Sequence, residues 1–101
     1  SSESNRNLAL MLQSQGQLDM AFDRFRKCQL DNSVMENLYN LGLDFERKRQ
    51  FNKAEHVFNY MATYDPSFKD IQQRTLTARQ LSETVILGGH PTPHLQTALM
   101  G

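Results

Sequence analysis

The chain is poor in the features that mark disulfide-stabilised, membrane-spanning and nucleic-acid-binding proteins. Its 101 residues include one cysteine, Cys28, which cannot form an internal disulfide. No apolar run approaches the roughly 18 residues that cross a bilayer. The 11 basic and 11 acidic side chains balance and are interspersed, which leaves no basic face for nucleic acid or anionic lipid. We therefore expect one small globular domain that binds no nucleic acid, does not insert into a membrane and suits the reducing cytoplasm.

Residue patterns that carry catalysis or metal binding are also missing from the sequence. It contains no glycine-rich phosphate loop, no nucleophile elbow and no pair of catalytic carboxylates. His56, His90 and His94 are scattered along the chain, whereas a metal site needs three or four converging ligands. Cys28 suits core packing better than it suits a reactive thiol. The sequence therefore predicts a protein that is not an enzyme and needs no metal or cofactor.

The feature that is present in abundance is helical periodicity. In residues 35–66, apolar side chains fall at i, i+3, i+4 and i+7 on two successive stretches, separated by a polar turn at residues 48–50. This pattern predicts a helical hairpin, in which the small residues Gly42 and Ala54 mark the closest approach of the two helices. The two stripes consist of Leu38, Leu41, Gly42 and Phe45, and of Ala54, Val57, Phe58 and Met61.

The same pattern occurs earlier in the chain. Each residue of this earlier copy precedes its equivalent in residues 35–66 by the same number of positions, the number that separates Ala21 from Ala54. This internal repeat predicts two hairpins, over residues 2–34 and 35–68, whose turns contain Gly16 and Arg49. A glycine reverses the chain at little steric cost, and Arg49 takes the equivalent place in the second turn. The equivalent pairs are Leu8 and Leu41, Ala9 and Gly42, Leu12 and Phe45, Leu18 and Phe51, Ala21 and Ala54, and Phe25 and Phe58.

A fifth helix is predicted over residues 67–83, with Ser67 as its N-cap. Its apolar stripe, which includes Ile71 and Ala78, is modest, and its other side chains are polar. This composition suits a terminal helix that covers the apolar side of the last hairpin. Residues 85–101 contain several glycines and prolines and are predicted to be a flexible linker or tail. The helical domain is thus expected over residues 1–84.

Polar residues at fixed places also predict where individual helices begin. Asp19 and Asn52 occupy equivalent positions and are expected to cap the second helix of each hairpin. Ser33 and Glu36 have the spacing of a capping box, which predicts the start of the third helix.

The second hairpin resembles the tetratricopeptide repeat, a family of helix-turn-helix units. The resemblance covers nearly every signature position, with Leu38 where the family often has Trp and Arg49 where it usually has Gly. It implies an all-α solenoid fragment of two hairpins and a capping helix. The positions that match the family's pattern are Leu41, Gly42, Phe45, Phe51, Ala54, Phe58, Asp65 and Pro66.

In such arrays the first helices of successive units line a concave groove, and the resemblance places six candidate binding residues there. Leu10, Tyr39 and Leu43 would form an apolar floor ringed by polar groups. That arrangement suits an extended or helical peptide of a partner protein, or equally a neighbouring repeat. The alternative function is a structural spacer or homodimerisation module without a peptide ligand, since two units fall below about three repeats. The candidate groove residues are Arg6, Leu10, Tyr39, Asn40, Leu43 and Arg47.

Residues 35–89 also resemble the tetratricopeptide region of bacterial serine/threonine protein kinases that carry an extracytoplasmic CHASE2 sensor. The segments that carry this resemblance are residues 43–61, 64–70 and, most specifically, 82–89 (SETVILGG). The resemblance implies a regulatory, juxtamembrane segment at the cytoplasmic face of the inner membrane, with catalysis outside this chain. Thr84 would then be a candidate phosphoacceptor, although an ordinary junction between helix and linker explains the same residues.

Overall fold

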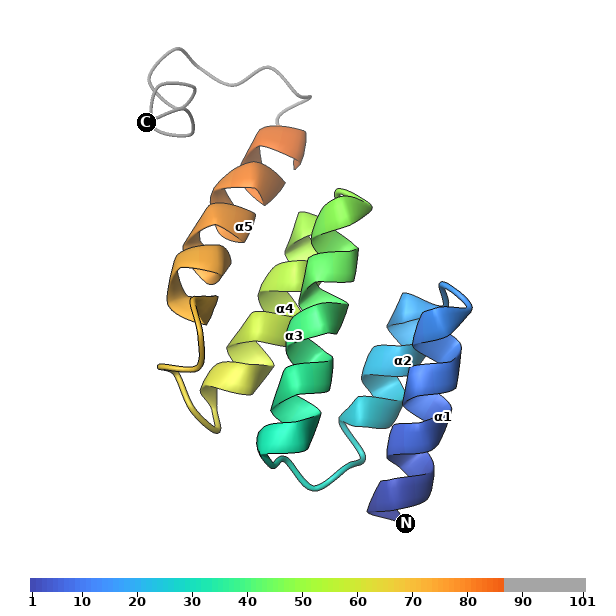
Figure 1. Cartoon of the computed structure of the whole chain (residues 1–101). Coiled ribbons are helices and arrows are strands. Elements are labelled where there is room, and N and C mark those ends of the chain that lie inside the picture. Colours follow the sequence, from blue (N-terminus) through green and yellow to red (C-terminus); the bar gives the residue numbers. More distant parts are fainter. Residues whose placement is uncertain (87–101) are drawn as a thin grey trace.

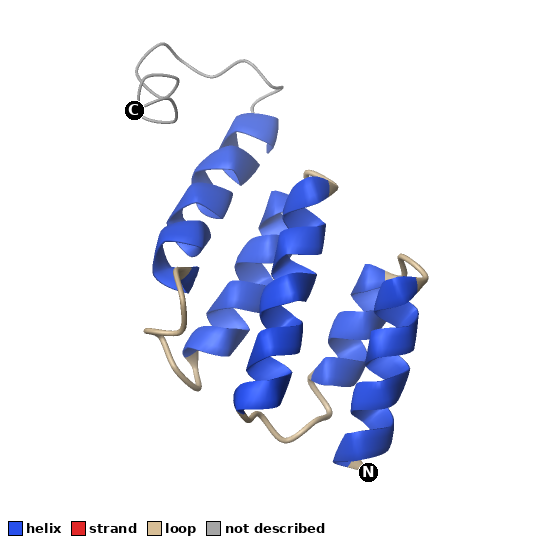
Figure 2. Ribbon diagram, viewed as in Figure 1, coloured by secondary structure: helices blue, strands red, loops and turns tan. Residues whose placement is uncertain are grey.

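The computed structural model describes residues 1–86, and all regular structure in this range is helical. Figures 1 and 2 show two antiparallel helix pairs followed by a single long helix. The predicted all-α class is confirmed. Of the predicted tail, residues 87–101 lie outside the described residues, and Val85 and Ile86 still belong to the last helix. The five helices are α1 (Ser2–Ser14), α2 (Leu18–Phe25), α3 (Asn32–Arg47), α4 (Phe51–Ala62) and α5 (Ile71–Ile86).

The helix boundaries and the core follow the sequence repeat. Helix α1 ends at Ser14 and α3 ends at the equivalent residue, Arg47, while α2 and α4 begin at the equivalent residues Leu18 and Phe51. Five of the six predicted pairs are buried at both members, and only Leu8 is less buried than its equivalent, Leu41. The two predicted hairpins, α1–α2 and α3–α4, are therefore present and share one core.

The two hairpin turns have the same backbone geometry. Gly16 and Arg49 both lie in the left-handed region, with φ of 79° and 60°. In the first turn, Gln17 N–H donates to the Leu12 carbonyl at 2.9 Å, and in the second Gln50 N–H donates to the Phe45 carbonyl at the same distance. These are the bonds of the Schellman motif, which satisfies carbonyls left over at a helix end.

Gly42 on α3 packs directly against the side chain of Phe58 on α4. A Cβ atom built on Gly42 would lie 2.3 Å from Cε1 of Phe58, whose ring is fully buried. The glycine therefore leaves the space that the Phe58 ring fills.

Helix α5 begins at Ile71 and not at the predicted residue 67, because the preceding segment folds into a turn. The Asp65 carboxylate accepts hydrogen bonds from Ser67 N–H at 3.0 Å and from Ser67 Oγ at 2.7 Å. Ser67 is therefore not a helix cap. Lys69, with φ of 45°, reverses the chain before the helix starts.

The predicted helix caps are also wrong. Helices α2 and α4 have Gln17 and Gln50 at the N-cap position, without a side-chain hydrogen bond, so Asp19 and Asn52 lie within the first turn. Asp31 caps α3 instead of Ser33, since its carboxylate accepts from Val34 N–H at 2.9 Å. This hydrogen bond lowers the pKa of Asp31, because it favours the charged carboxylate.

Helix α5 packs mainly against α4, and polar side chains also join α3 to the start of α5. Arg6 Nε on α1 donates to Asn37 Oδ1 on α3 at 2.8 Å. One repeat later in both partners, Tyr39 OH donates to Asp70 Oδ1 at 2.7 Å, just before α5. In Figure 1, α1 and α3 lie in front of α2 and α4, and α5 lies beside the second hairpin.

Candidate functional site

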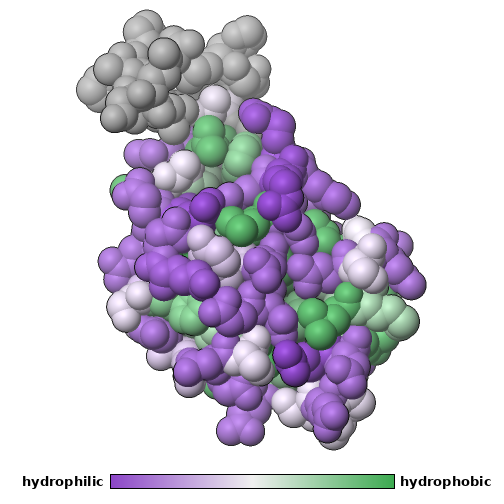
Figure 3. All heavy atoms as spheres, viewed as in Figure 1, coloured by the Kyte–Doolittle hydropathy of each residue, from purple (hydrophilic) through white to green (hydrophobic). Residues whose placement is uncertain are grey.

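The face formed by α1, α3 and α5 contains two hollows and holds most of the predicted site residues. Figure 3 views the molecule from this side and shows a mainly hydrophilic surface with separate hydrophobic patches. One hollow lies between α1 and α3, and the other lies between α3 and α5. We call them the α1/α3 hollow and the α3/α5 hollow.

The α1/α3 hollow has a volume of about 320 Å³, and most of the residues that line it are polar. Gln13 Nε2 donates to Asp44 Oδ2 across it at 2.8 Å, which ties α1 to α3. Gln13 Oε1 is buried and accepts no hydrogen bond from the described residues. A buried acceptor without a donor costs free energy, about 1–3 kcal/mol. The lining residues are Leu10, Gln13, Ser14, Asn37, Asn40 and Asp44.

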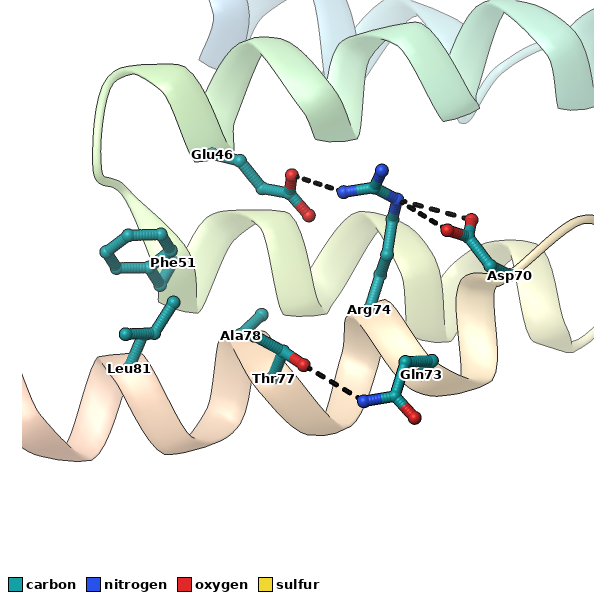
Figure 4. A pocket seen from close by; sticks show the side chains of 8 residues that line it. All are labelled: Glu46, Phe51, Asp70, Gln73, Arg74, Thr77, Ala78 and Leu81. Carbon is teal, nitrogen blue, oxygen red and sulfur yellow. Dashed lines mark hydrogen bonds and ion pairs between the residues drawn. The ribbon is translucent and has the colours of Figure 1, made fainter. Parts of the chain in front are cut away.

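The α3/α5 hollow, of about 280 Å³, combines a charged end with an apolar end (Figure 4). At the charged end, Arg74 NH1 donates to Glu46 Oε1 at 2.7 Å, and Arg74 Nε lies 3.2 Å from the Asp70 carboxylate. Figure 4 shows the side chains of Phe51 and Leu81 close together at the opposite end. The hollow can therefore accept an apolar side chain beside groups that bind polar atoms.

Tyr39 ties α3 to α5 at the edge of this hollow. Its hydroxyl donates to Asp70 and accepts from Arg74 Nε at 3.1 Å, while its ring lies 6.4 Å from the rings of Phe58 and Phe68. The hydrogen bond to Asp70 raises the pKa of Tyr39 and lowers that of Asp70. Tyr39 thus holds the helices together instead of providing an open apolar floor.

The pKa of Arg74 reflects two opposing effects. Partial burial disfavours its charged form, but the hydrogen bonds to Tyr39 and Glu46 outweigh burial and raise the pKa of the guanidinium. Arg74 therefore stays charged at the α3/α5 junction.

The six predicted groove residues are only partly brought together. Leu10 and Asn40 line the α1/α3 hollow, and Arg6 reaches its edge through Asn37. Leu43 is half-buried on α3, and Arg47 is an exposed residue that forms an ion pair with Asp44. Neither Leu43 nor Arg47 lines either of the two hollows.

The charges on this face are largely paired with one another. Lys69 lies 3.3 Å from Glu36, and the pairs of Arg47 with Asp44 and of Arg74 with Glu46 are described above. A ligand on this face would therefore gain little from long-range attraction and would depend on hydrogen bonds and apolar contacts.

The α3/α5 hollow is the part of the site that sequence reasoning missed. Its residues come from three helices, and Glu46 and Leu81 are far apart in sequence. The available signal was the spacing of Asp70, Arg74 and Ala78 at i, i+4 and i+8, which puts two charged residues and a small one on one face of α5. The sequence analysis assigned the polar residues of this helix to a solvent-exposed face and therefore did not single out these three.

Other groups singled out in the sequence have structural settings. The Cys28 thiol is buried, and burial raises its pKa, which disfavours the reactive thiolate. Thr84 lies within α5, where its hydroxyl donates to the Gln80 carbonyl at 3.1 Å.

Within residues 1–86, no group of three or more His, Cys, Asp or Glu side chains is arranged to hold a metal ion. In the same range, no helix has the length and apolar character of a membrane span.

Comparisons with known proteins return no relatives. No protein-family model matches the chain, and neither the curated proteins nor the solved structures contain a significant match.

Proposed function

We propose that this chain is a tetratricopeptide-type protein-interaction module whose α1/α3/α5 face binds an extended segment of a partner protein. We also propose that this chain acts only by binding and does not itself catalyse a reaction. Its support comes from the sequence signature and from the repeated relation between first helices, not from any relative.

The observation that carries the proposal is that side-chain hydrogen bonds join equivalent positions at both junctions along the chain. Because Arg6–Asn37 and Tyr39–Asp70 are related by the sequence repeat, α1, α3 and α5 present equivalent positions in a row. A row of equivalent first helices makes a continuous surface that an extended chain can follow, as in solenoid arrays. The two hollows lie along this row.

The chemistry of the hollows indicates which parts of a peptide would contact them. In the α1/α3 hollow, the exposed amide of Asn40 can both donate to and accept from a peptide backbone. In the α3/α5 hollow, Phe51 and Leu81 can cover an apolar side chain. The ligand would therefore be an extended segment with an apolar anchor.

Peptide selection tests the proposal. Random peptides displayed on phage would be selected against the wild-type chain and measured by fluorescence anisotropy. We expect Asn40→Arg to weaken binding about tenfold or more, because a long charged side chain blocks the α1/α3 hollow. Asn59→Arg is the matched control, since Asn59 is also an exposed helical asparagine but lies on α4, away from this face.

Tyr39 is a poor choice for this test, because its removal would release α5 and confuse lost binding with lost structure. Failure to select any peptide, or equal loss in Asn40→Arg and Asn59→Arg, would contradict the proposal.

The proposal extends to the chain's setting as a regulatory segment beside a bacterial serine/threonine kinase domain, on the cytoplasmic side. This rests on the resemblance of residues 35–89, of which 87–89 lie outside the described residues. The parent reading frame beyond Gly101 tests it, because a kinase glycine loop and catalytic loop should follow. Phosphorylation of Thr84 would require opening the last turns of α5, and phosphosite mapping after ATP treatment of the parent protein checks it.

A further inference from the structure

A further hollow lies between α2 and α4, the helices behind α1 and α3 in Figure 1. Its volume is about 240 Å³. An apolar cavity of about 150 Å³ accommodates benzene, so this hollow has room for a ring and a small polar group. None of its residues lines the α1/α3 hollow or the α3/α5 hollow. We call it the outer hollow, and its lining residues are Phe22, Arg26, His56, Asn59 and Tyr60.

Two aromatic rings and a guanidinium form a compact cluster in the outer hollow. The rings of Phe22 on α2 and Tyr60 on α4 meet edge to face, with their centroids 5.9 Å apart. The guanidinium carbon of Arg26 lies 5.4 Å from the Phe22 centroid and 5.9 Å from the Tyr60 centroid. Both contacts are cation–π interactions, which attract the cation to the rings. They hold the Arg26 side chain at the hollow without the help of a ligand.

The charge of Arg26 is not balanced by a carboxylate. Arg47, Arg74 and Arg79 each form an ion pair with an acidic side chain, but Arg26 forms none within residues 1–86. None of the five lining residues is acidic, and Asp23, one turn before Arg26, is exposed and forms no ion pair with it. A cation–π contact uses the face of a guanidinium, so the N–H groups in its plane can still donate. Arg26 is therefore placed to bind an oxyanion.

The repeat does not require this cluster. One repeat later, Glu55 stands in the place of Phe22. Asn59 likewise stands in the place of Arg26. Neither Phe22 nor Arg26 belongs to the buried positions that the two hairpins share. The cluster is therefore specific to the junction between α2 and α4, and the packing of the repeat does not explain it.

We infer that the outer hollow binds a small aromatic carboxylate. The two oxygens of a carboxylate match the planar fork of the Arg26 guanidinium, which favours bidentate pairing. The ring of the ligand would contact Phe22 and Tyr60, whose rings line the same hollow. The amide of Asn59 and the hydroxyl of Tyr60 are further groups able to donate to the ligand. This site is separate from the proposed peptide-binding face and does not depend on it.

The exposure of the outer hollow limits the affinity. Arg26, His56 and Asn59 are exposed, and Phe22 and Tyr60 are half-buried. Pockets that bind ligands tightly cover about 70–90% of the ligand surface, whereas this hollow would leave much of a ligand in water. The dissociation constant should therefore be on the order of 1 mM.

Titration of the full, isotope-labelled chain with benzoate tests the inference. Nuclear magnetic resonance would follow the backbone amides and the Nε–H signals of the arginines. Benzoate should cause saturable shifts at Phe22, Arg26 and Tyr60. Acetate has the carboxylate without the ring, and benzamide has the ring without the charge. Each should bind about tenfold more weakly than benzoate, because it lacks one of the two contacts.

Substitutions of two arginines separate the site from a general effect of charge. Arg26→Gln should weaken benzoate binding about tenfold or more, because a neutral amide cannot form the charge-assisted pair. Arg24→Gln is the matched control, since Arg24 is on α2, forms no ion pair within residues 1–86 and does not line the outer hollow. It should bind benzoate within about twofold of the wild type. Circular dichroism should show the same helix content in both variants.

Three results would overturn the inference. The first is the absence of saturable shifts at the outer hollow when benzoate is added. The second is acetate or benzamide binding as tightly as benzoate, which would show that the ring and the carboxylate are not recognised together. The third is an equal loss of affinity in Arg26→Gln and Arg24→Gln, which would show that benzoate responds only to net charge.

Discussion

Gly42 is the residue at which the geometry of the second hairpin is most constrained. A methyl group there would lie 2.3 Å and 2.5 Å from two atoms of the Phe58 ring. The ring is fully buried among core side chains and cannot swing into solvent. The glycine therefore sets how closely α3 and α4 can pack.

We predict that Gly42→Ala destabilises the chain by about 1–2 kcal/mol. Overpacking a core costs about 1–3 kcal/mol, and the better helix propensity of alanine offsets up to about 1 kcal/mol of this. Urea unfolding followed by circular dichroism measures the difference. A variant as stable as the wild type would show that Phe58 has room to move.

Arg49 supports the opposite prediction in the equivalent turns. It adopts φ of 60°, which strains a residue with a side chain, whereas Gly16 takes the equivalent place without strain. Arg49→Gly should stabilise the chain by about 0.5–1 kcal/mol, after loss of the guanidinium contact with the Phe51 ring. Gly16→Ala should cost about 1 kcal/mol. Thermal unfolding of both variants checks the pair, and a less stable Arg49→Gly would show that strain at this position is negligible.

Residue patterns predicted most of the buried positions of both hairpins, with Leu8 as the exception among the equivalent pairs. The constant repeat offset and the i, i+3, i+4 spacing depend on the shape of a helix, so they need no knowledge of distant contacts. The caps were mispredicted because several polar residues near each helix start could act as the N-cap residue. In the first and third helices, Ser1 and Asp31 make the capping bonds.

At the scale of elements, α5 docks through both an apolar stripe and a polar network. Ile71 and Ala78 are buried against the core, while Asp70 and Arg74 join α5 to α3 through Tyr39 and Glu46. The start of α5 could not be predicted, because the Ser67 hydroxyl donates a hydrogen bond to the Asp65 carboxylate. Ser67 therefore lies in a turn and does not cap the helix. Whether Ser67 caps a helix or joins a turn depends on which nearby polar group it bonds. The pattern of apolar residues contains no information about this.

The lowered pKa of Asp70 predicts a pH-dependent contribution to stability. Its ordinary value is 3.8, and the Tyr39 hydroxyl lowers it in the folded chain. A lowered pKa means that the stabilisation is complete above the unfolded pKa and is lost as pH falls through the folded one. Asp70→Asn should therefore be less stable than the wild type near neutral pH, and the difference should shrink below about pH 4.

Urea unfolding of both proteins from neutral pH to about pH 2.5 measures this difference. Asp23→Asn is the control, since Asp23 is exposed and makes no side-chain hydrogen bond or ion pair within residues 1–86. The wild type should still lose stability in acid after the Asp70 change, because Asp31 also has a lowered pKa. A difference that stays constant with pH would contradict the role given to Asp70.

At the scale of the whole molecule, α1, α3 and α5 together line two hollows that no single helix could form. The resemblance to tetratricopeptide arrays placed Leu10 and Asn40 in a groove, and both residues line the α1/α3 hollow. Sequence reasoning did not predict that Tyr39 would join α3 to the start of α5 through its bond to Asp70. It also did not predict that Phe51 and Leu81 would line a second hollow. Those features depend on where α5 docks, which the repeat alone does not determine.

Amide chemical-shift mapping of a selected peptide on isotope-labelled chain would locate the binding face directly. We predict that shifts concentrate along α1, α3 and α5, around Leu10, Asn40 and Arg74. Shifts concentrated instead on the outer sides of α2 and α4, around Phe22 and Asn59, would contradict the proposed peptide-binding face.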